Sequence, residues 1–361
     1  MLKYSEALLM KRCLNERSVR TMSELYMDLG ANGYSITVRR GALEEAGELM
    51  KLQRKVLIVT DDGVPEEYSE KVASFCGEPH IVTLPQGEHN KCMRTYMELL
   101  ETMVENGVDR NDCVVAVGGG VMGDLAGFVA STYMRGVDFY NVPTTLLSQI
   151  DSSIGGKVAV DFKGYKNIVG AFYQPKAVLI DPDVLKTLSQ RQLACGMAEA
   201  VKMFATFNKE MFEEVEANGS ENIDKIILEA LKIKKAVVEQ DEKENGLRKV
   251  LNFGHTVGHA IESIEENNDY PLFHGECVGI GMLCMSSPET ARRLRHILHR
   301  MDIPTAWRGD EKELKEAMLH DKKAKDGAIT VITVDEVGTY RTEKMTVDEI
   351  TERCREVLTL S

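Results

Sequence analysis

The sequence lacks any apolar run close to the roughly 20 residues that a membrane-spanning helix needs. Its beginning, MLKYSEALLMKRCLNERS, also lacks an apolar stretch followed by a small-residue cleavage site, so we predict no signal peptide. The 361 residues carry a formal net charge of −13, which disfavours nucleic acid and anionic membranes as partners. These features predict a cytoplasmic protein that binds neither.

CxxC pairs are absent as well. The eight cysteines are scattered along the chain, and none stands two residues from another in a CxxC pattern. This spacing indicates neither a zinc finger nor a redox motif. We therefore expect free thiols in a reducing compartment.

The chain is longer than a single hydrophobic core usually supports, which suggests two domains. The periodicity of its apolar residues changes near residue 184. Before that point, short apolar runs such as KVLIVTDD and CVVAVGGG alternate with helical stretches, which predicts a parallel sheet with helices on both faces. After it the pattern is helical, apart from a hairpin predicted in AITVITVD and GTYRTEKM. We predict an N-terminal extension (1–30), an α/β domain (31–183) and a mainly α domain (184–361).

A glycine-rich turn follows one of the predicted buried strands. Residues 114–128 read VVAVGGGVMGDLAGF, so a strand leads into Gly118, Gly119 and Gly120 and then into a helix. Exposed amides at a helix N-terminus favour an anion such as a diphosphate. The spacing is GGGxxGD, which is neither the dinucleotide fingerprint GxGxxG nor a P-loop, and a plain glycine turn is the alternative.

Polar residues follow at the same predicted edge of the sheet. The carboxyl ends of parallel strands are where open α/β sheets bind ligands. A carboxylate, lysines and glycines gathered in one loop region are difficult to explain by packing alone. The residues in question are Thr144, Thr145, Asp151, Lys157, Lys166 and Asn167.

Three histidines and one glutamate suggest a metal site. His255 and His259 are four residues apart and would share one face of a helix, and His274 follows after a polar loop. Three imidazoles suit a zinc-like ion, and Glu199, in an apolar helical setting, is another candidate ligand. Thr256 stands where the HExxH motif of zinc proteases has its glutamate, which argues against peptide hydrolysis.

Cationic residues accompany these histidines and predict a substrate with two anionic groups. The spacing of four, three and four residues predicts that one helical face presents a cation, an amide and two imidazoles. These residues are Arg248, Asn252, His255 and His259, with Arg135 and Lys234 as further cations.

The motifs together resemble the 3-dehydroquinate synthase family. The matching stretches include GGGVMGDLAGFVAS, PTTLLSQIDSSIGGK, GMAEAVK, NFGHTVGHAIE and HGECV, and they cover most of the chain from about residue 31. The resemblance implies a cytoplasmic homodimer with a Rossmann-like NAD-binding α/β domain, an α domain and an active site between them. It also implies NAD and a divalent metal, zinc or cobalt, as cofactors.

The implied reaction converts 3-deoxy-D-arabino-heptulosonate 7-phosphate, a phosphorylated sugar acid, into 3-dehydroquinate and phosphate in the shikimate pathway. In this family NAD accepts a hydride from the substrate, phosphate is eliminated, NADH returns the hydride, and an intramolecular aldol step closes the ring. The resemblance therefore implies a lyase, despite the redox steps.

The resemblance also implies a role for each matching residue. The metal ligands would be Glu199, His255 and His274, with His259 facing the substrate. The phosphate would be held by Arg135 (reaching across the dimer), Lys157, Asn167 and Lys322 or Lys323, and the carboxylate by Lys234 and Arg248. Hydroxyls and water would be contacted by Asp151, Lys202, Asn252 and His259. NAD would be met by Asp61, Glu88, Lys91, Gly119, Gly120, Asp124, Thr144, Thr145, Leu147, Asp151, Lys157, Lys166, Thr187 and Leu188.

Three features depart from the family pattern: the first ~30 residues have no counterpart, the stretch 279–304 is short, and Gln192 replaces a glutamate. Three other functions compete with this one. A related cyclase making an inosose or valiolone would not need Lys234 and Arg248, because its substrate lacks a carboxylate. A metal-dependent glycerol or alcohol dehydrogenase would need fewer anion-binding residues, and a non-catalytic NAD-binding regulator would not need the metal ligands.

Overall fold

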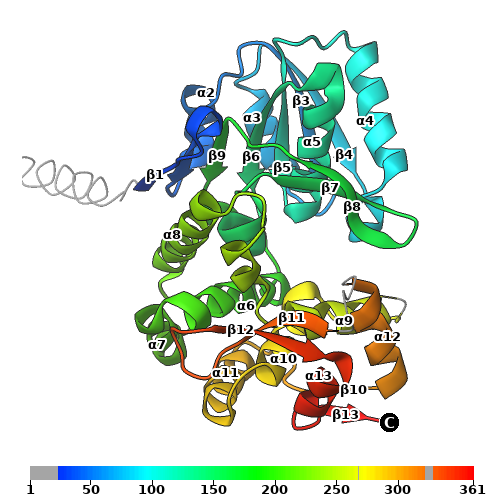
Figure 1. Ribbon diagram of the computed structural model, residues 1–361. Helices are drawn as coiled ribbons and strands as arrows, with labels where there is room; N and C mark the ends of the chain where they lie inside the picture. Colours follow the sequence, from blue (N-terminus) through cyan, green and yellow to red (C-terminus); the bar gives the residue numbers. More distant parts are fainter. Residues whose placement is uncertain (1–22, 267, 322–327) are drawn as a thin grey trace, which may run out of the picture.

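The computed structural model describes residues 23–266, 268–321 and 328–361. A sheet-containing part, in blue to green, lies above a mainly helical part, in green to red (Figure 1). The seven cysteines within the described residues form no disulfide bonds. None of the described helices has the length and apolar composition that a membrane span needs.

The sheet has seven strands in the order β1-β2-β9-β6-β5-β3-β4. All neighbours run parallel except β1 and β2 at one edge, which run antiparallel. The parallel sheet predicted from the alternating pattern is thus confirmed. The strands are β1 (Ser23–Met27), β2 (Tyr34–Val38), β3 (Lys55–Asp61), β4 (Glu78–Leu84), β5 (Cys113–Gly118), β6 (Asp138–Pro143) and β9 (Ala177–Ile180).

Helices cover both faces of the sheet because successive strand residues point to opposite sides. Leu57 and Val59 of β3 pack with helices α4 and α5, whereas Val56 and Ile58 pack against the opposite layer, which includes Val72 of α3. The helices of this part are α2 (Ala46–Leu49), α3 (Glu66–Ala73), α4 (Met93–Glu105) and α5 (Gly120–Thr132).

Strand β1 corrects the predicted boundary of the N-terminal extension. Residues 23–27 were expected to precede the fold, but they pair with β2 over the whole length of both strands. Met27 is fully buried and Leu25 packs against the core, so this short segment has the alternating apolar residues of an edge strand.

The core of the helical part is continuous with the β1–β2–β9 edge of the large sheet, because Met27, Ile36 and Ile180 belong to the same buried cluster, and two small sheets accompany it. The predicted hairpin is confirmed as β11 (Ala328–Thr333) and β12 (Arg341–Thr346), whereas the short parallel pair β10 (Trp307–Gly309) and β13 (Leu358–Leu360) was not predicted. The helices are α6 (Gln190–Phe207), α7 (Lys209–Asn218), α8 (Ile223–Gln240), α9 (His255–Glu265), α10 (His274–Cys284), α11 (Pro288–Arg300), α12 (Glu311–Asp321) and α13 (Val347–Cys354).

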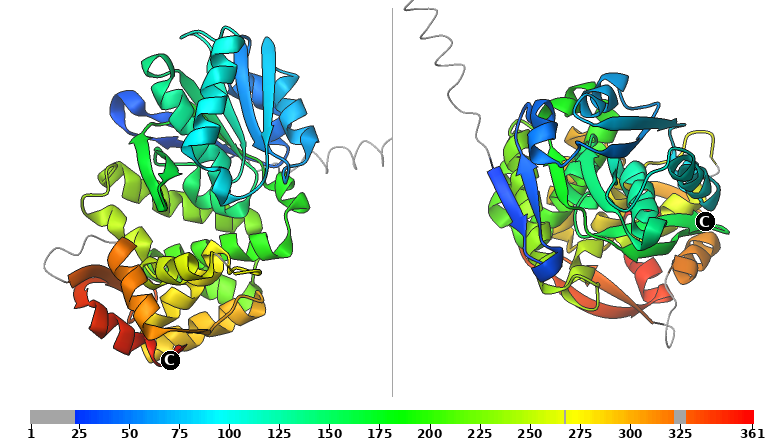
Figure 2. Two further views of the ribbon diagram at one scale, coloured as in Figure 1. Left: turned by 90° about the vertical axis from the view of Figure 1, so that its right-hand side faces the viewer. Right: turned by 90° about the horizontal axis from the view of Figure 1, so that it is seen from above.

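An antiparallel hairpin that was not predicted lies between the large sheet and the helical part. Strands β7 (Lys157–Phe162) and β8 (Tyr165–Phe172) form an antiparallel pair outside the large sheet. The hairpin packs on α5 and extends toward the helical part, as both side views show (Figures 1 and 2). Residues of both its strands, including Val158 and Asn167, line the cavity described below.

Candidate active site and metal centre

Three neighbouring strands of the sheet end together, and their last residues carry the predicted nucleotide-contacting groups. Asp61 ends β3 and is buried, Gly118 ends β5, and Thr144 follows β6. The Thr144 amide donates a hydrogen bond to the Gly118 carbonyl at 2.9 Å, which fixes the two loops side by side. Burial raises the pKa of Asp61, although the amides of Gly63 and Val64 act in the opposite direction.

The glycine turn lies directly against its neighbours at this edge. A Cβ on Gly119 would stand 3.1 Å from Thr145 Cγ2, and one on Gly120 would stand 3.0 Å from Ser152 Oγ. Both glycines open helix α5, whose first amides face outward. The absence of side chains thus keeps the main chain accessible where an anion can approach.

Three predicted nucleotide residues form one ion-pair cluster beside this turn. Lys91 Nζ lies 2.5 Å from Glu88 Oε1 and 3.5 Å from Asp124 Oδ2. Burial raises the pKa of Asp124 to about 7, although Lys91 acts in the opposite direction. Asp124 also lines the cavity described below, so it joins the glycine edge to the centre of the site.

The remaining nucleotide candidates are more dispersed. Leu147 precedes a π-turn (Ser148–Ser152), and Leu188 ends a 3₁₀ turn that contains Thr187. The hydroxyls of Thr187 and Tyr68 share a hydrogen bond of 3.1 Å. Lys166 projects from β8, where its ammonium lies 3.0 Å from Glu262 Oε1.

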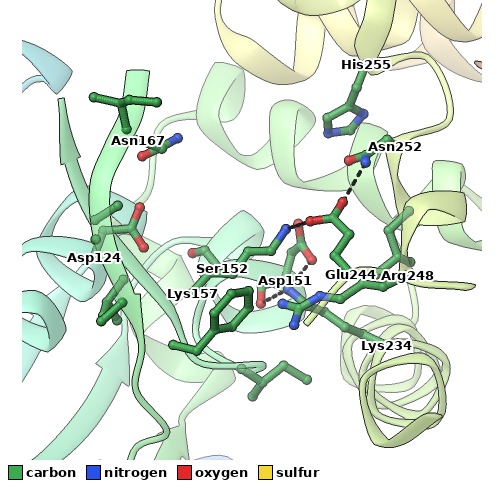
Figure 3. A pocket seen from close by; sticks show the side chains of 18 of the residues that line it. Asp124, Asp151, Ser152, Lys157, Asn167, Lys234, Glu244, Arg248, Asn252 and His255 are labelled. Atoms are coloured by element: carbon green, nitrogen blue, oxygen red, sulfur yellow. Dashed lines mark hydrogen bonds and ion pairs between the residues drawn. The ribbon is translucent and has the colours of Figure 1, made fainter. Parts of the chain in front are cut away.

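A cavity of about 530 Å³ lies between the β7–β8 hairpin and the helical part. Figure 3 shows Asp124 and Asn167 on one side of it and Lys234, Arg248 and His255 on the other. Nine predicted site residues line it: Asp124, Asp151, Lys157, Asn167, Lys202, Lys234, Arg248, Asn252 and His255.

Asp151 and Lys234 form a buried ion pair in this cavity (Figure 3). Burial lowers the pKa of Lys234 to about 8, although Asp151 raises it. Burial would raise the pKa of Asp151, but Lys234 and Lys202 together bring it below its usual value. A lysine with a pKa so near neutrality is typical of a functional cleft.

Glu244 and Ser152 also line the cavity, and neither was predicted as a site residue. The Glu244 carboxylate forms an ion pair with Lys157 and accepts a hydrogen bond of 2.8 Å from the Asn252 amide. Glu244 has a positive φ of 59°, an uncommon conformation for a residue with a side chain. The sequence signal that could have identified it is its place four residues before Arg248.

The predicted single helical face for Arg248, Asn252 and the histidines is wrong. Residues Leu247–Asn252 form a 3₁₀ turn, and helix α9 begins only at His255. Gly254 between them has φ 78°, and a Cβ there would stand 2.8 Å from the backbone of α10. Close packing of α9 on α10 therefore breaks the helix, yet Arg248, Asn252 and His255 still line one cavity.

Glu199 lies fully buried beside two of the imidazoles. Its Oε1 is 3.8 Å from His255 Nε2 and 3.7 Å from His274 Nε2, and it accepts no hydrogen bond from any residue in the described part of the chain. Its Oε2 accepts a hydrogen bond of 2.5 Å from Lys202. Ligands about 2.0–2.1 Å from a tetrahedral Zn²⁺ are about 3.4 Å from each other, so this trio fits one ion.

His259 offers a competing third imidazole. Ring nitrogens of His255, His259 and His274 all lie within 4.8 Å of one another. We favour Glu199 over His259 as the third ligand, because a buried carboxylate oxygen without a hydrogen bond is costly unless it binds a cation. His259 is not among the residues that line the cavity of about 530 Å³.

Different groups orient the two imidazoles that face Glu199. His255 Nδ1–H donates to the Phe253 carbonyl at 3.1 Å, and His274 Nδ1–H donates to Glu262 Oε2 at 2.9 Å. Both bonds leave Nε2 facing Glu199. Burial and Lys202 lower the pKa of His255 well below its usual value, whereas Glu262 outweighs burial and raises the pKa of His274.

Three predicted phosphate-contacting residues are not placed in the cavity. Arg135 is exposed at the end of α5 and does not line it. Lys322 and Lys323 lie outside the described residues. Of the predicted phosphate contacts, Lys157 and Asn167 remain in this chain's cavity.

Known proteins resemble this chain over most of its length. Residues 81–195 match the family model described as 3-dehydroquinate synthase N-terminal, and residues 196–324 match that described as 3-dehydroquinate synthase C-terminal. The 3-dehydroquinate synthase of Campylobacter concisus is 42% identical over 305 residues, which cover 81% of this chain and 88% of the relative.

Solved structures of two other cyclases share the fold. 2-Deoxy-scyllo-inosose synthase, complexed with carbaglucose-6-phosphate, NAD⁺ and Co²⁺, superposes with a TM-score of 0.82 at 27% identity, covering 94% of this chain and 100% of that one. The 2-epi-5-epi-valiolone synthase of Streptomyces hygroscopicus, with NAD⁺ and Zn²⁺ bound, superposes with a TM-score of 0.80 at 26% identity, covering 90% and 96%.

Proposed function

The chain belongs to the 3-dehydroquinate synthase family and is an enzyme of that activity, and we propose that its reaction takes place in the cavity between the β7–β8 hairpin and the helical part. The strongest support is the buried Oε1 of Glu199, at 3.8 and 3.7 Å from the Nε2 atoms of His255 and His274. No packing role accounts for a carboxylate oxygen held there without a hydrogen-bond donor among the described residues.

We assign the metal to Glu199, His255 and His274, with zinc or cobalt as the ion. When bound, the metal polarises a substrate oxygen, and NAD takes up and returns a hydride. Two nitrogens and one oxygen leave a fourth position open, as catalytic zinc sites require. The hydrogen bonds at both Nδ1 atoms leave the Nε2 lone pairs directed toward Glu199 Oε1, where these three ligands would hold the ion.

Cationic side chains supply the remaining substrate contacts. Lys234 and Arg248, both buried, would hold the substrate carboxylate, and Lys157 with Asn167 would hold the phosphate. Such groups, fixed before the reaction, stabilise charge as it moves to the departing phosphate. Substrate hydroxyls and water would be contacted by Asp151, Lys202, Asn252 and His259.

We place NAD along the edge formed by the glycine turn. Its diphosphate would lie at the Gly119–Gly120 amides, where the N-terminus of α5 favours negative charge. The further contacts proposed for it are Asp61, Glu88, Lys91, Asp124, Thr144, Thr145, Leu147, Asp151, Lys157, Lys166, Thr187 and Leu188.

Nucleotide binding is assigned to residues up to 183, including β1, and metal and substrate binding to residues 184–361. We propose a cytoplasmic homodimer, in which the exposed Arg135 of one subunit contributes to the phosphate site of the other. Lys322 or Lys323 would complete that site.

The activity is distinguished from that of an inosose or valiolone synthase by the substrate carboxylate. Among the cations that line the cavity, Lys157 pairs with Glu244, Lys202 with Glu199 and Lys234 with Asp151. Arg248 instead donates to the carbonyls of Gly155 and Glu242, so its charge forms no ion pair with a carboxylate of the described residues. A substrate without a carboxylate would leave this excess positive charge uncompensated in a buried place, which is unfavourable.

The most direct test is phosphate release from 3-deoxy-D-arabino-heptulosonate 7-phosphate with catalytic NAD. We expect release without net NADH accumulation, its loss on chelation, and its recovery on addition of Zn²⁺ or Co²⁺. Release that continues unchanged in a metal-free, NAD-free protein would contradict the proposed site. Net NADH production from a simple polyol would favour a dehydrogenase instead.

A further inference from the structure

Glu262 makes contacts that none of the assignments above explain. It lies on helix α9 with His255 and His259, at spacings of four and three residues, so all three share one face. Its Oε2 accepts the hydrogen bond from His274 Nδ1 at 2.9 Å, and its Oε1 lies 3.0 Å from Lys166 Nζ. One carboxylate thus contacts a metal-ligand imidazole and the β7–β8 hairpin together.

The His274 contact determines which ring nitrogen is available. With Nδ1–H donating to Glu262, the lone pair of the neutral ring is on Nε2, which faces Glu199 Oε1 at 3.7 Å. His255 is oriented by a neutral carbonyl, that of Phe253. Glu262 is therefore the one charged group that orients a proposed ligand imidazole within the described residues.

The Lys166 contact joins the two walls of the cavity. Lys166 belongs to β8 in the sheet-containing part, whereas Glu262 belongs to α9 in the helical part. The Glu262 side chain is 20% exposed, so its ion pair with Lys166 is only partly screened by water. Lys166 thus contacts one oxygen of the carboxylate whose other oxygen accepts from His274.

On the basis of the proposed metal site, we propose that Glu262 is a positioning residue that fixes His274 for metal binding and, through Lys166, links metal binding to the position of the β7–β8 hairpin. A carboxylate behind a ligand histidine fixes the ring and increases its basicity, and its loss lowers metal affinity by about 10–100-fold. Loss of the partly exposed Lys166 pair would lower metal affinity by about threefold, because ion pairs exposed to water contribute little.

The test is the affinity of the full-length protein for Zn²⁺, measured by competition with a chromophoric chelator. We expect Glu262→Ala to bind about 10–100-fold more weakly than wild type, Glu262→Gln to lose less, because its amide oxygen still accepts from Nδ1–H, and Lys166→Met to lose least. Glu266→Ala is the matched control, since its carboxylate, 3.9 Å from Lys166 and largely exposed, should leave affinity unchanged.

A second readout needs no metal. ¹⁵N spectra of the metal-free protein, recorded at alkaline pH where the ring is neutral, should show His274 as the Nδ1–H tautomer in wild type and a loss of this preference in Glu262→Ala. If wild type binds no Zn²⁺, the proposed metal site itself is wrong. If wild type binds Zn²⁺ and the Zn²⁺ affinity of Glu262→Ala equals that of Glu266→Ala, the positioning role is overturned. If Glu262→Ala does not fold, an unchanged Zn²⁺ affinity in both Glu262→Gln and Lys166→Met overturns the role equally.

Discussion

The two walls of the cavity are built by different means. On the sheet-containing wall, main-chain amides and glycines at the ends of β3, β5 and β6 lie next to Asp124, which lines the cavity, and these groups follow each other within short loops. The helical wall presents buried charged side chains from α6, α8 and α9, drawn from positions far apart in the sequence. Backbone groups can bind an anion at little desolvation cost, whereas buried charges require mutual compensation.

The difference shows in how the charged groups are satisfied. Glu199 and Lys202 are 0% and 1% exposed as side chains and pair at 2.5 Å, and Lys234 pairs with Asp151. Replacing such pairs by apolar residues of similar size is often neutral or stabilising. Their presence in the helical wall therefore argues for a functional rather than a stabilising role.

The largest expected effect comes from removing a carboxylate of the helical wall. Glu199→Ala should abolish tight Zn²⁺ binding and lower kcat/KM by about 10³-fold, because a catalytic metal contributes several kcal/mol. Metal content by atomic emission and phosphate release measure the two effects. His274→Ala should behave in the same way.

His259→Ala is the matched control for that experiment. It should retain stoichiometric Zn²⁺ while losing activity, since His259 is assigned to the substrate and Glu199 to the metal. If His259→Ala binds no metal and Glu199→Ala retains it, the three histidines are the metal ligands instead.

A smaller effect is expected at the substrate carboxylate. Arg248→Ala should lower kcat/KM on the order of 100-fold, because truncating one member of a buried charge pair costs ~2–5 kcal/mol. Lys249→Ala, at an exposed neighbouring position, should leave kcat/KM unchanged. Steady-state phosphate release measures kcat/KM for both variants. An unchanged kcat/KM in Arg248→Ala would contradict the proposal that Arg248 holds the substrate carboxylate.

Sequence patterns predicted the sheet-containing wall better than the helical one. The run from β5 through Gly118 into α5 is local, so an apolar stretch followed by glycines was sufficient to predict a strand, a turn and a helix. The β7–β8 hairpin escaped prediction because it is not part of the large sheet and its strands are half-exposed.

The helical wall depends on tertiary contacts that no local pattern contains. The break at Gly254 arises from the close approach of α10, and without that information Arg248 and His255 seem to share one helix. Glu244 and Glu262 were missed for a related reason: their partners, Lys157 and His274, are distant in sequence or on another helix. Residue types could suggest a metal, but not the groups that orient its ligands.

The glycine turn offers a test confined to the sheet-containing wall. Gly119→Ala would place a Cβ 3.1 Å from Thr145 Cγ2, so either the threonine or the turn must shift. We expect NAD affinity to fall by about tenfold, which corresponds to ~1.4 kcal/mol, while Zn²⁺ content stays stoichiometric. Fluorescence titration with NADH measures the nucleotide affinity, and metal analysis measures the Zn²⁺ content. A loss of Zn²⁺ together with the loss of NADH affinity would show that the two walls do not bind their ligands independently.

The smallest expected effect is a pH dependence that arises in the helical wall alone. The pKa of Lys234 in the free protein is lowered to about 8, first by burial and further by Arg248, against the opposing effect of Asp151. Lys234 is cationic below that pH and neutral above it, so capture of the substrate carboxylate should weaken as pH rises. Between pH 7 and pH 8 its charged fraction falls from about nine-tenths to one-half, and kcat/KM should fall by about twofold. Lys234→Arg, which stays charged, should remove this alkaline limb, whereas its persistence in Lys234→Arg would assign the limb to another group.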